Sequence, residues 1–140
     1  MRRLTRLLVL PVLAASLAAQ AQELQDLGPG AEPGSQLFLE MADLQIVGDL
    51  RIVAIRTVPD PNSPRKSPKG EGETIGYLSE RHTFNCAQGR HHIDHLMYYY
   101  IDGDYDTDNY DAEEGWQAVM AGTLVEKVFK KVCAITTTAQ

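Results

Sequence analysis

The chain contains two cysteines, Cys86 and Cys133, which bracket its most strongly patterned stretch. The N-terminus has the features of an export signal, and two cysteines in an exported chain are most simply joined in one disulfide bond. Such a bond would close a long loop and add roughly 4 kcal/mol of stability on the chain-entropy model. A redox or catalytic cysteine is the alternative, but the Cys-x-x-Cys spacing typical of it is absent from the sequence. We therefore expect the fold to bring the segment that carries Cys133 against the segment that carries Cys86.

Residues 1–21 have the three parts of a secretory signal. Residues 7–19 form a short apolar core, and Ala-Gln-Ala at 19–21 fits the small-x-small cleavage rule, so we expect the mature chain to begin at Gln22. The basic start of the segment consists of Arg2, Arg3 and Arg6. An uncleaved membrane anchor is the alternative, although a span needs roughly 20 apolar residues and no later segment approaches that length. No cysteine follows the apolar core, so a lipid-anchored N-terminus is not expected.

The mature chain is strongly acidic. Removing residues 1–21 takes away three of the 13 basic residues and none of the 19 acidic ones, which leaves a net charge of −9 from 10 basic and 19 acidic side chains. Nucleic-acid partners require a basic surface, and anionic lipid would repel this one. The remaining length suits one domain with a modest core.

Most of the mature chain predicts β-structure. The alternating and β-branched runs predict strands at residues 37–41, 50–58, 74–86 and 91–101. A flexible tether is expected at 22–35, which is rich in glycine, proline and acid, and a long exposed loop at 59–72, which has four prolines. A turn is expected at 43–46, the domain at 36–135, and a disordered tail at 136–140.

One helix is predicted near the C-terminus. Thr123 and Glu126 form a capping box at its start. An apolar face at helical spacing then follows, made by Leu124, Val125, Val128, Phe129 and Val132. The predicted fold class is α+β: a mainly antiparallel sheet of about four or five strands, with this C-terminal helix packed on it and one disulfide.

The acidic stretch 102–114 is expected to be a loop, and it partly matches a calcium-binding register. Its acidic residues at positions 1, 3, 5, 7 and 12 of that register are Asp102, Asp104, Asp106, Asp108 and Glu113. Thr107 stands where the register needs glycine, and no pair of helices flanks the stretch. A solvated acidic turn is the other interpretation.

The histidines suggest a second possible metal site. On a regular strand His91 and His95 would share one face, and His92 and Asp94 the other. His82 on the neighbouring strand would complete a zinc or copper site across the hairpin. Partly exposed strand histidines without a metal are the alternative.

No motif for catalysis is present. The sequence lacks GxSxG and HExxH motifs, and the disulfide would leave no free cysteine nucleophile, so we predict a non-enzymatic protein without a cofactor. The leading interpretation is a binding protein that contacts an unidentified protein partner through loops and an exposed hairpin. The candidate contact residues are Arg65, Lys66 and Lys69 of the proline-rich loop, together with Arg81, His82, Arg90, His91 and His92. The alternatives are a periplasmic metal-binding module and an envelope protein whose sheet edge pairs with a partner.

Two segments resemble a known family. Residues 81–90 read RHTFNCAQGR, a tyrosine-rich strand follows, and residues 114–133 read EGWQAVMAGTLVEKVFKKVC. With the export signal, this pattern resembles the bacterial surface-adhesin E family over residues 37–133. The resemblance implies a small exported protein with an antiparallel sheet, a C-terminal helix and a cysteine pair at Cys86 and Cys133, and Trp116 corresponds to the family's tryptophan. It also implies adhesion to host matrix or plasma proteins, and residence in the periplasm or on the surface of a Gram-negative bacterium.

Overall fold

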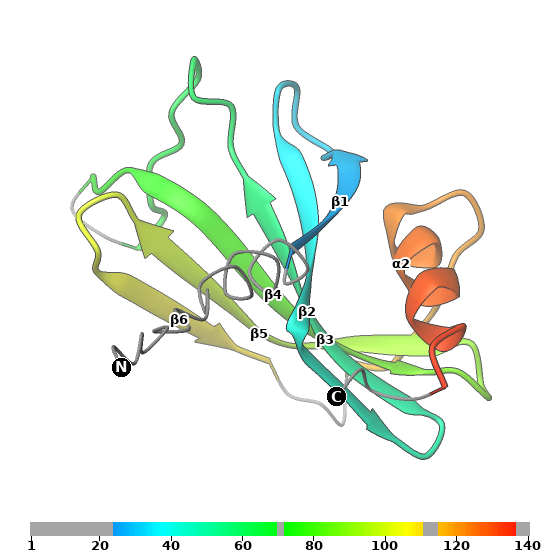
Figure 1. Ribbon diagram of the computed structural model, residues 1–140. Coiled ribbons are helices and arrows are strands. Elements are labelled where there is room, and N and C mark those ends of the chain that lie inside the picture. Colours follow the sequence, from blue (N-terminus) through cyan, green and yellow to red (C-terminus); the bar gives the residue numbers. More distant parts are fainter. Residues whose placement is uncertain (1–23, 70–71, 111–114, 137–140) are drawn as a thin grey trace, which may run out of the picture.

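The computed structural model describes residues 24–69, 72–110 and 115–136. The predicted export signal, residues 111–114 of the acidic stretch and residues 137–140 of the predicted tail lie outside this part. The described part is one antiparallel sheet with one helix, α2 (Leu124–Cys133), on one side of it (Figure 1). The predicted antiparallel sheet and C-terminal helix are therefore confirmed.

The sheet is a meander in which consecutive strands are neighbours, in the order β1-β2-β3-β4-β5-β6. The prediction of four or five strands is wrong, because seven strands occur among the described residues. They are β1 (Leu24–Pro29), β2 (Gln36–Val47), β3 (Leu50–Val58), β4 (Ile75–Asn85), β5 (Arg90–Tyr100), β6 (Tyr105–Asn109) and the short β7 (Gln117–Ala118), which pairs with β5.

Strand β1 lies within the segment that we expected to be a tether, so that prediction is wrong for residues 24–29. The register with β2 shifts between Asp26 and Gly28, and Gly28 has a positive φ of 94°. Leu27 between them is buried in the core, with 3% of its surface exposed. Leu27 is the one buried side chain of β1, so the sequence of this segment shows no alternation of apolar and polar residues. The strand is stabilised by its pairing with β2.

Two other segments that we expected to be irregular are also strands. The turn predicted at 43–46 is part of β2, which continues to Val47 after a register shift between Glu40 and Gln45. Part of the predicted acidic loop is β6. The tyrosine hydroxyls of the neighbouring strand β5 donate hydrogen bonds to the acids of β6, from Tyr100 to Asp106 at 2.6 Å and from Tyr98 to Asp108 at 3.2 Å. These partners allow an acidic segment to lie in a sheet.

Helix α2 begins as the capping box predicts. The Thr123 hydroxyl oxygen accepts from Glu126 N, and the Glu126 carboxylate accepts from Gly122 N at 2.8 Å. Val128 and Val132 on its buried face pack against strand residues in the main core. That core consists of Leu27, Leu37, Leu39, Val53, Ile55, Phe84, Val128 and Val132.

A second, smaller core lies beside the first. It consists of Ile75, Leu78, Tyr98 and Tyr100, with Leu96 against it. The proline-rich segment between β3 and β4 folds towards it, since the hydroxyl groups of Ser67 and Tyr100 lie 2.7 Å apart. Lys66 and Thr74 of the same segment form a β-bridge. This segment is therefore fastened to the sheet.

Candidate functional site

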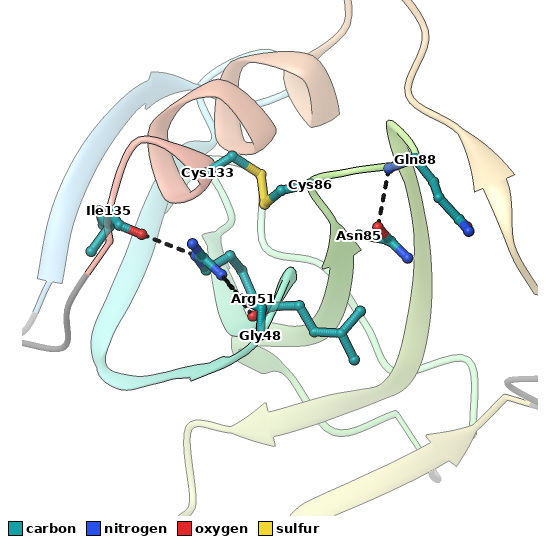
Figure 2. The surroundings of a disulfide bond; sticks show 8 residues. Gly48, Arg51, Asn85, Cys86, Gln88, Cys133 and Ile135 are labelled. Carbon is teal, nitrogen blue, oxygen red and sulfur yellow. Dashed lines mark hydrogen bonds between the residues drawn. A yellow bond between two sulfur atoms is a disulfide. The ribbon is translucent and has the colours of Figure 1, made fainter.

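The disulfide joins the end of α2 to the end of β4 (Figure 2). Cys86 and Cys133 are bonded, with their Cα atoms 5.7 Å apart and a separation of 47 positions in sequence. Arg51 supports the same region, since its guanidinium donates to the carbonyl oxygens of Ile135 at 3.0 Å and Gly48 at 2.8 Å. The predicted disulfide is confirmed, and it closes the fold at one end of the sheet.

The other side of the sheet carries no described helix. Leu39 and Val53 point into the core under α2, so the neighbouring residues Glu40 and Ala54 point to the opposite side. The pairing Glu40–Ala54–Arg81–His95 forms one row across β2 to β5 on that side. We call this side the helix-free face. It contains a hollow of about 200 Å³ lined by Glu40, Asp43, Gln45, Ser79, Arg81, His95, Met97 and Tyr99, among others.

A cluster of tyrosines and one arginine adjoins this hollow. The Tyr77 and Tyr99 rings are stacked with centroids 4.4 Å apart, and Tyr105 lies 6.1 Å from Tyr99. The Arg56 guanidinium lies 4.1 Å from the centre of the Tyr77 ring, and its Nε donates to Glu40 at 2.6 Å. We call Arg56, Tyr77, Tyr99 and Tyr105 the tyrosine–arginine cluster. It combines ring stacking, a cation–π contact and an ion pair on one surface.

The environment of Tyr99 keeps its hydroxyl protonated. Burial raises the pKa of Tyr99 above its ordinary value, and Tyr77 and Glu40 raise this pKa further. The hydroxyl donates to the Met97 sulfur at 3.4 Å. Sequence reasoning missed this cluster, although Arg56 interrupts an apolar strand and three tyrosines stand in a row at 98–100. Alternation along β5 buries Tyr98 and Tyr100 and puts Tyr99 on the helix-free face.

The expected histidine site is not assembled. The register of β4 and β5 shifts between Arg81 and His82, so that Arg81 pairs with His95 and His82 with Ile93. This bulge puts His95 on the helix-free face, whereas His91 lies in the core beside Phe84, with ring centroids 5.8 Å apart. The prediction that His91 and His95 share a face is therefore wrong. Within the described ranges no three His, Cys, Asp or Glu side chains are grouped to hold a metal ion.

The described acids of the calcium register are likewise not grouped round one point. Asp106 and Asp108 of β6 accept hydrogen bonds from tyrosines of β5, and Asp102 accepts from the backbone N of Asp104 at 3.0 Å. Glu113, the ligand at position 12 of the register, lies outside the described residues. A strand in place of a loop spreads its carboxylates along the chain rather than round one point.

The basic residues of the proline-rich segment have partners within the chain. Arg65 pairs with Glu32 at 3.0 Å, and Lys66 donates to the Thr74 hydroxyl at 2.7 Å. Lys69 pairs with Asp108, and this hydrogen bond raises the pKa of the lysine above its ordinary value. Of these three cations, Lys69 bonds to a strand of the sheet, and the partners of Arg65 and Lys66 lie in the connections between strands.

The second expected contact patch, which comprises Arg81, Arg90 and three histidines, does not form one exposed surface. His82, His91 and His92 are buried, with 2%, 7% and 6% of their surfaces exposed. His92 packs edge-on against Trp116, and Arg90 donates to the Trp116 carbonyl at 3.0 Å. Arg81 stays partly exposed on the helix-free face.

Comparison with known proteins identifies the family. The model of the family described as surface-adhesin protein E matches residues 24–134, well over half of the chain. The chain belongs to the surface-adhesin protein E family. The match confirms the resemblance seen in the sequence, and it begins at β1, outside the domain limits that we expected.

A solved structure shows the same fold. The structure of Haemophilus influenzae protein E superposes with a TM-score of 0.54 at 10% sequence identity, covering 79% of this chain and 93% of that one. At this identity the likeness concerns the fold alone. A search of curated proteins finds no match. None of the helices in the described part of this surface-adhesin E protein is long and apolar enough to cross a membrane.

Proposed function

We propose that this surface-adhesin E protein is an exported, non-enzymatic adhesin that binds another protein through its helix-free face. Family membership supports the adhesive role. The observation that carries the choice of surface is the tyrosine–arginine cluster, in which Tyr105 is 62% exposed beside the stacked pair of Tyr77 and Tyr99. Tyrosine and arginine, together with tryptophan, are enriched among the residues that contribute most binding energy at protein interfaces.

The cluster is organised before any partner arrives. Stacking fixes the Tyr77 and Tyr99 rings, and Glu40 holds Arg56 over Tyr77. Side chains that are already ordered lose little conformational entropy on binding, so more of the contact energy appears as affinity. The adjacent hollow of about 200 Å³ gives room for a side chain of the partner.

The proline-rich segment is a weaker choice of contact surface. Its three cations have partners in the same chain, and a partner protein would have to compete with them. Contacts made by its loop would be electrostatic and would weaken as salt screens them. Contacts made by stacking on the tyrosine–arginine cluster depend much less on salt.

The proposal is tested by pull-down against immobilised matrix and plasma proteins at low and high salt. We expect the double variant Tyr105→Ala, Arg56→Ala to weaken binding at least tenfold, since alanine replacement at such positions typically costs about 2 kcal/mol or more. Lys66→Ala in the proline-rich segment is the matched control and should bind as the original protein does. If the double variant bound as tightly as the original protein and Lys66→Ala lost binding, adhesion would be assigned to the proline-rich segment instead.

The site of action is tested separately by protease shaving of whole bacteria. We propose residence at the cell surface or in the periplasm of a Gram-negative bacterium. Digestion of the protein on intact cells indicates surface display. Protection until the outer membrane is opened indicates the periplasm.

A further inference from the structure

A second hollow lies on the opposite side of the sheet, between the strands and the first half of α2. It has a volume of about 280 Å³. Its walls are mostly aliphatic, and they are formed by Leu37, Ile55, Leu78, Leu124, Val125 and Val128. Small ligands bind in apolar hollows of roughly this size that contain a few well-placed polar groups.

The hollow is also lined by charged side chains, of which two are acidic and one is basic. Glu32 and Arg65 also line it, and their charges offset each other because they pair at 3.0 Å. Glu80 is the remaining acid, and His82 is its partner, with Nε2 lying 3.0 Å from the carboxylate. A neutral imidazole that donates from Nε2 leaves the charge of Glu80 in place. With this neutral form of His82, the hollow carries one uncompensated negative charge beside its aliphatic walls.

Glu80 is held in position by a buried support. His82 is only 2% exposed and packs against Phe84, with ring centroids 5.7 Å apart. Glu80 itself is 37% exposed, so one side of its carboxylate is fixed while the group stays accessible. A fixed carboxylate next to apolar walls favours a ligand with a cationic hydrogen-bond donor at one end.

We propose that this hollow binds an aliphatic chain that ends in an ammonium group, with the chain against Leu78 and Val125 and the ammonium at Glu80. A volume of about 280 Å³ equals roughly nine water molecules, which suits a chain of about six carbons with its amine. A carboxylate at the same end would be repelled by Glu80. The proposal does not depend on the helix-free face.

The proposal is tested on the oxidised protein by NMR titration with three probes of equal chain length: hexylamine at neutral pH, 1-hexanol and hexanoate. Either head group can donate a hydrogen bond to the Glu80 carboxylate, and the ammonium adds the attraction of a partly exposed ion pair, so we expect hexylamine to bind about threefold to fivefold more tightly than 1-hexanol. Hexanoate should bind most weakly. The methyl signals of Leu124, Val125 and Val128 should shift with hexylamine.

Two variants locate the site. Glu80→Gln should remove the preference for hexylamine over 1-hexanol, and Val125→Trp should weaken both probes by filling the hollow. Asp49→Asn is the matched control, since it removes an exposed acid that does not line the hollow, and it should leave the preference unchanged. Equal binding of hexylamine and hexanoate to the original protein, or shifts confined to residues outside the hollow, would overturn the proposal without any variant.

Discussion

His91 shows how one residue ties stability to pH. Its ring lies in the core, and its centroid is 5.8 Å from the ring centroids of both His82 and Phe84. Burial lowers the pKa of His91 below its ordinary value, and the charges of His82 and His92 lower it further. Its Nδ1 and that of His82 have no hydrogen-bond partner among the residues that the structure describes. A proton on Nδ1 of His91 would therefore find no acceptor among these residues.

The direction of the pH dependence follows from this lowered pKa. Around and below pH 6.5 the unfolded chain binds a proton at His91 that the folded chain resists, so the free energy of unfolding falls as pH drops. We expect the urea midpoint to be lower at pH 5 than at pH 7.5, and His91→Phe to reduce that difference. His95→Phe on the helix-free face is the control. An unchanged pH dependence in His91→Phe would show that another group is responsible.

At the scale of elements, each outer strand of the sheet, β1 and β6, has a backbone carbonyl that accepts a hydrogen bond from a lysine. Lys127 of α2 donates to the carbonyl of Leu27, where the register of β1 shifts. Lys69 donates to the carbonyl of Thr107 in β6 at 2.9 Å. The backbone groups of Asp104 and Tyr110 form hydrogen bonds with β5, so the backbone N–H and C=O groups of even-numbered residues in this segment point towards β5. The carbonyl of the odd-numbered Thr107 therefore points away from the sheet. A lysine at an edge strand blocks the addition of another strand.

These lysines bear on the idea that a sheet edge pairs with an envelope partner. We expect the double variant Lys69→Met, Lys127→Met to form dimers as its concentration rises, because two carbonyl groups at the edges lose their donors. Size-exclusion chromatography with light scattering measures this. Lys130→Met, which removes a lysine paired with Glu126 on α2, should leave the mass unchanged. A double variant with the same mass as the original protein would show that the lysines do not protect the edges.

At the scale of the whole molecule, the disulfide connects the last element to the middle of the meander. Each described strand from β1 to β6 pairs with its sequence neighbour, so the sheet is built from local pairings. Helix α2 packs instead on residues from β1 to β4. The bond between Cys86 and Cys133 spans 47 residues and brings this distant element to the sheet.

Removing this bond should cost a large part of the stability. For a loop of this length the chain-entropy model gives about 4 kcal/mol, against a total of about 5–15 kcal/mol for a typical domain. We expect the double variant Cys86→Ser, Cys133→Ser to unfold at a much lower urea concentration than the oxidised protein. Reduction of the original protein should give the same midpoint as the double variant. Equal midpoints for oxidised and reduced protein would contradict the prediction.

The residues alone were sufficient for the features that depend on local chemistry. The capping box at Thr123 and Glu126, the apolar face of α2 and the antiparallel sheet are expressed in short-range spacing, and the cysteine pair follows from counting. Strands β1 and β6 were missed because their stability comes from neighbours: Leu27 enters a core built by other elements, and Asp106 and Asp108 meet tyrosine hydroxyls of β5.

The composition of the candidate sites depended on which side chains share a face of the sheet, and this is not evident from the sequence alone. A single bulge beside Arg81 moved His95 away from His91 and separated the expected histidine site. The same sheet brought Arg56, Tyr77 and Tyr99 together from three strands. Side-chain alternation can be followed along one strand, but the register between strands is set by long-range pairing, and a shift of one residue reverses which side chains meet.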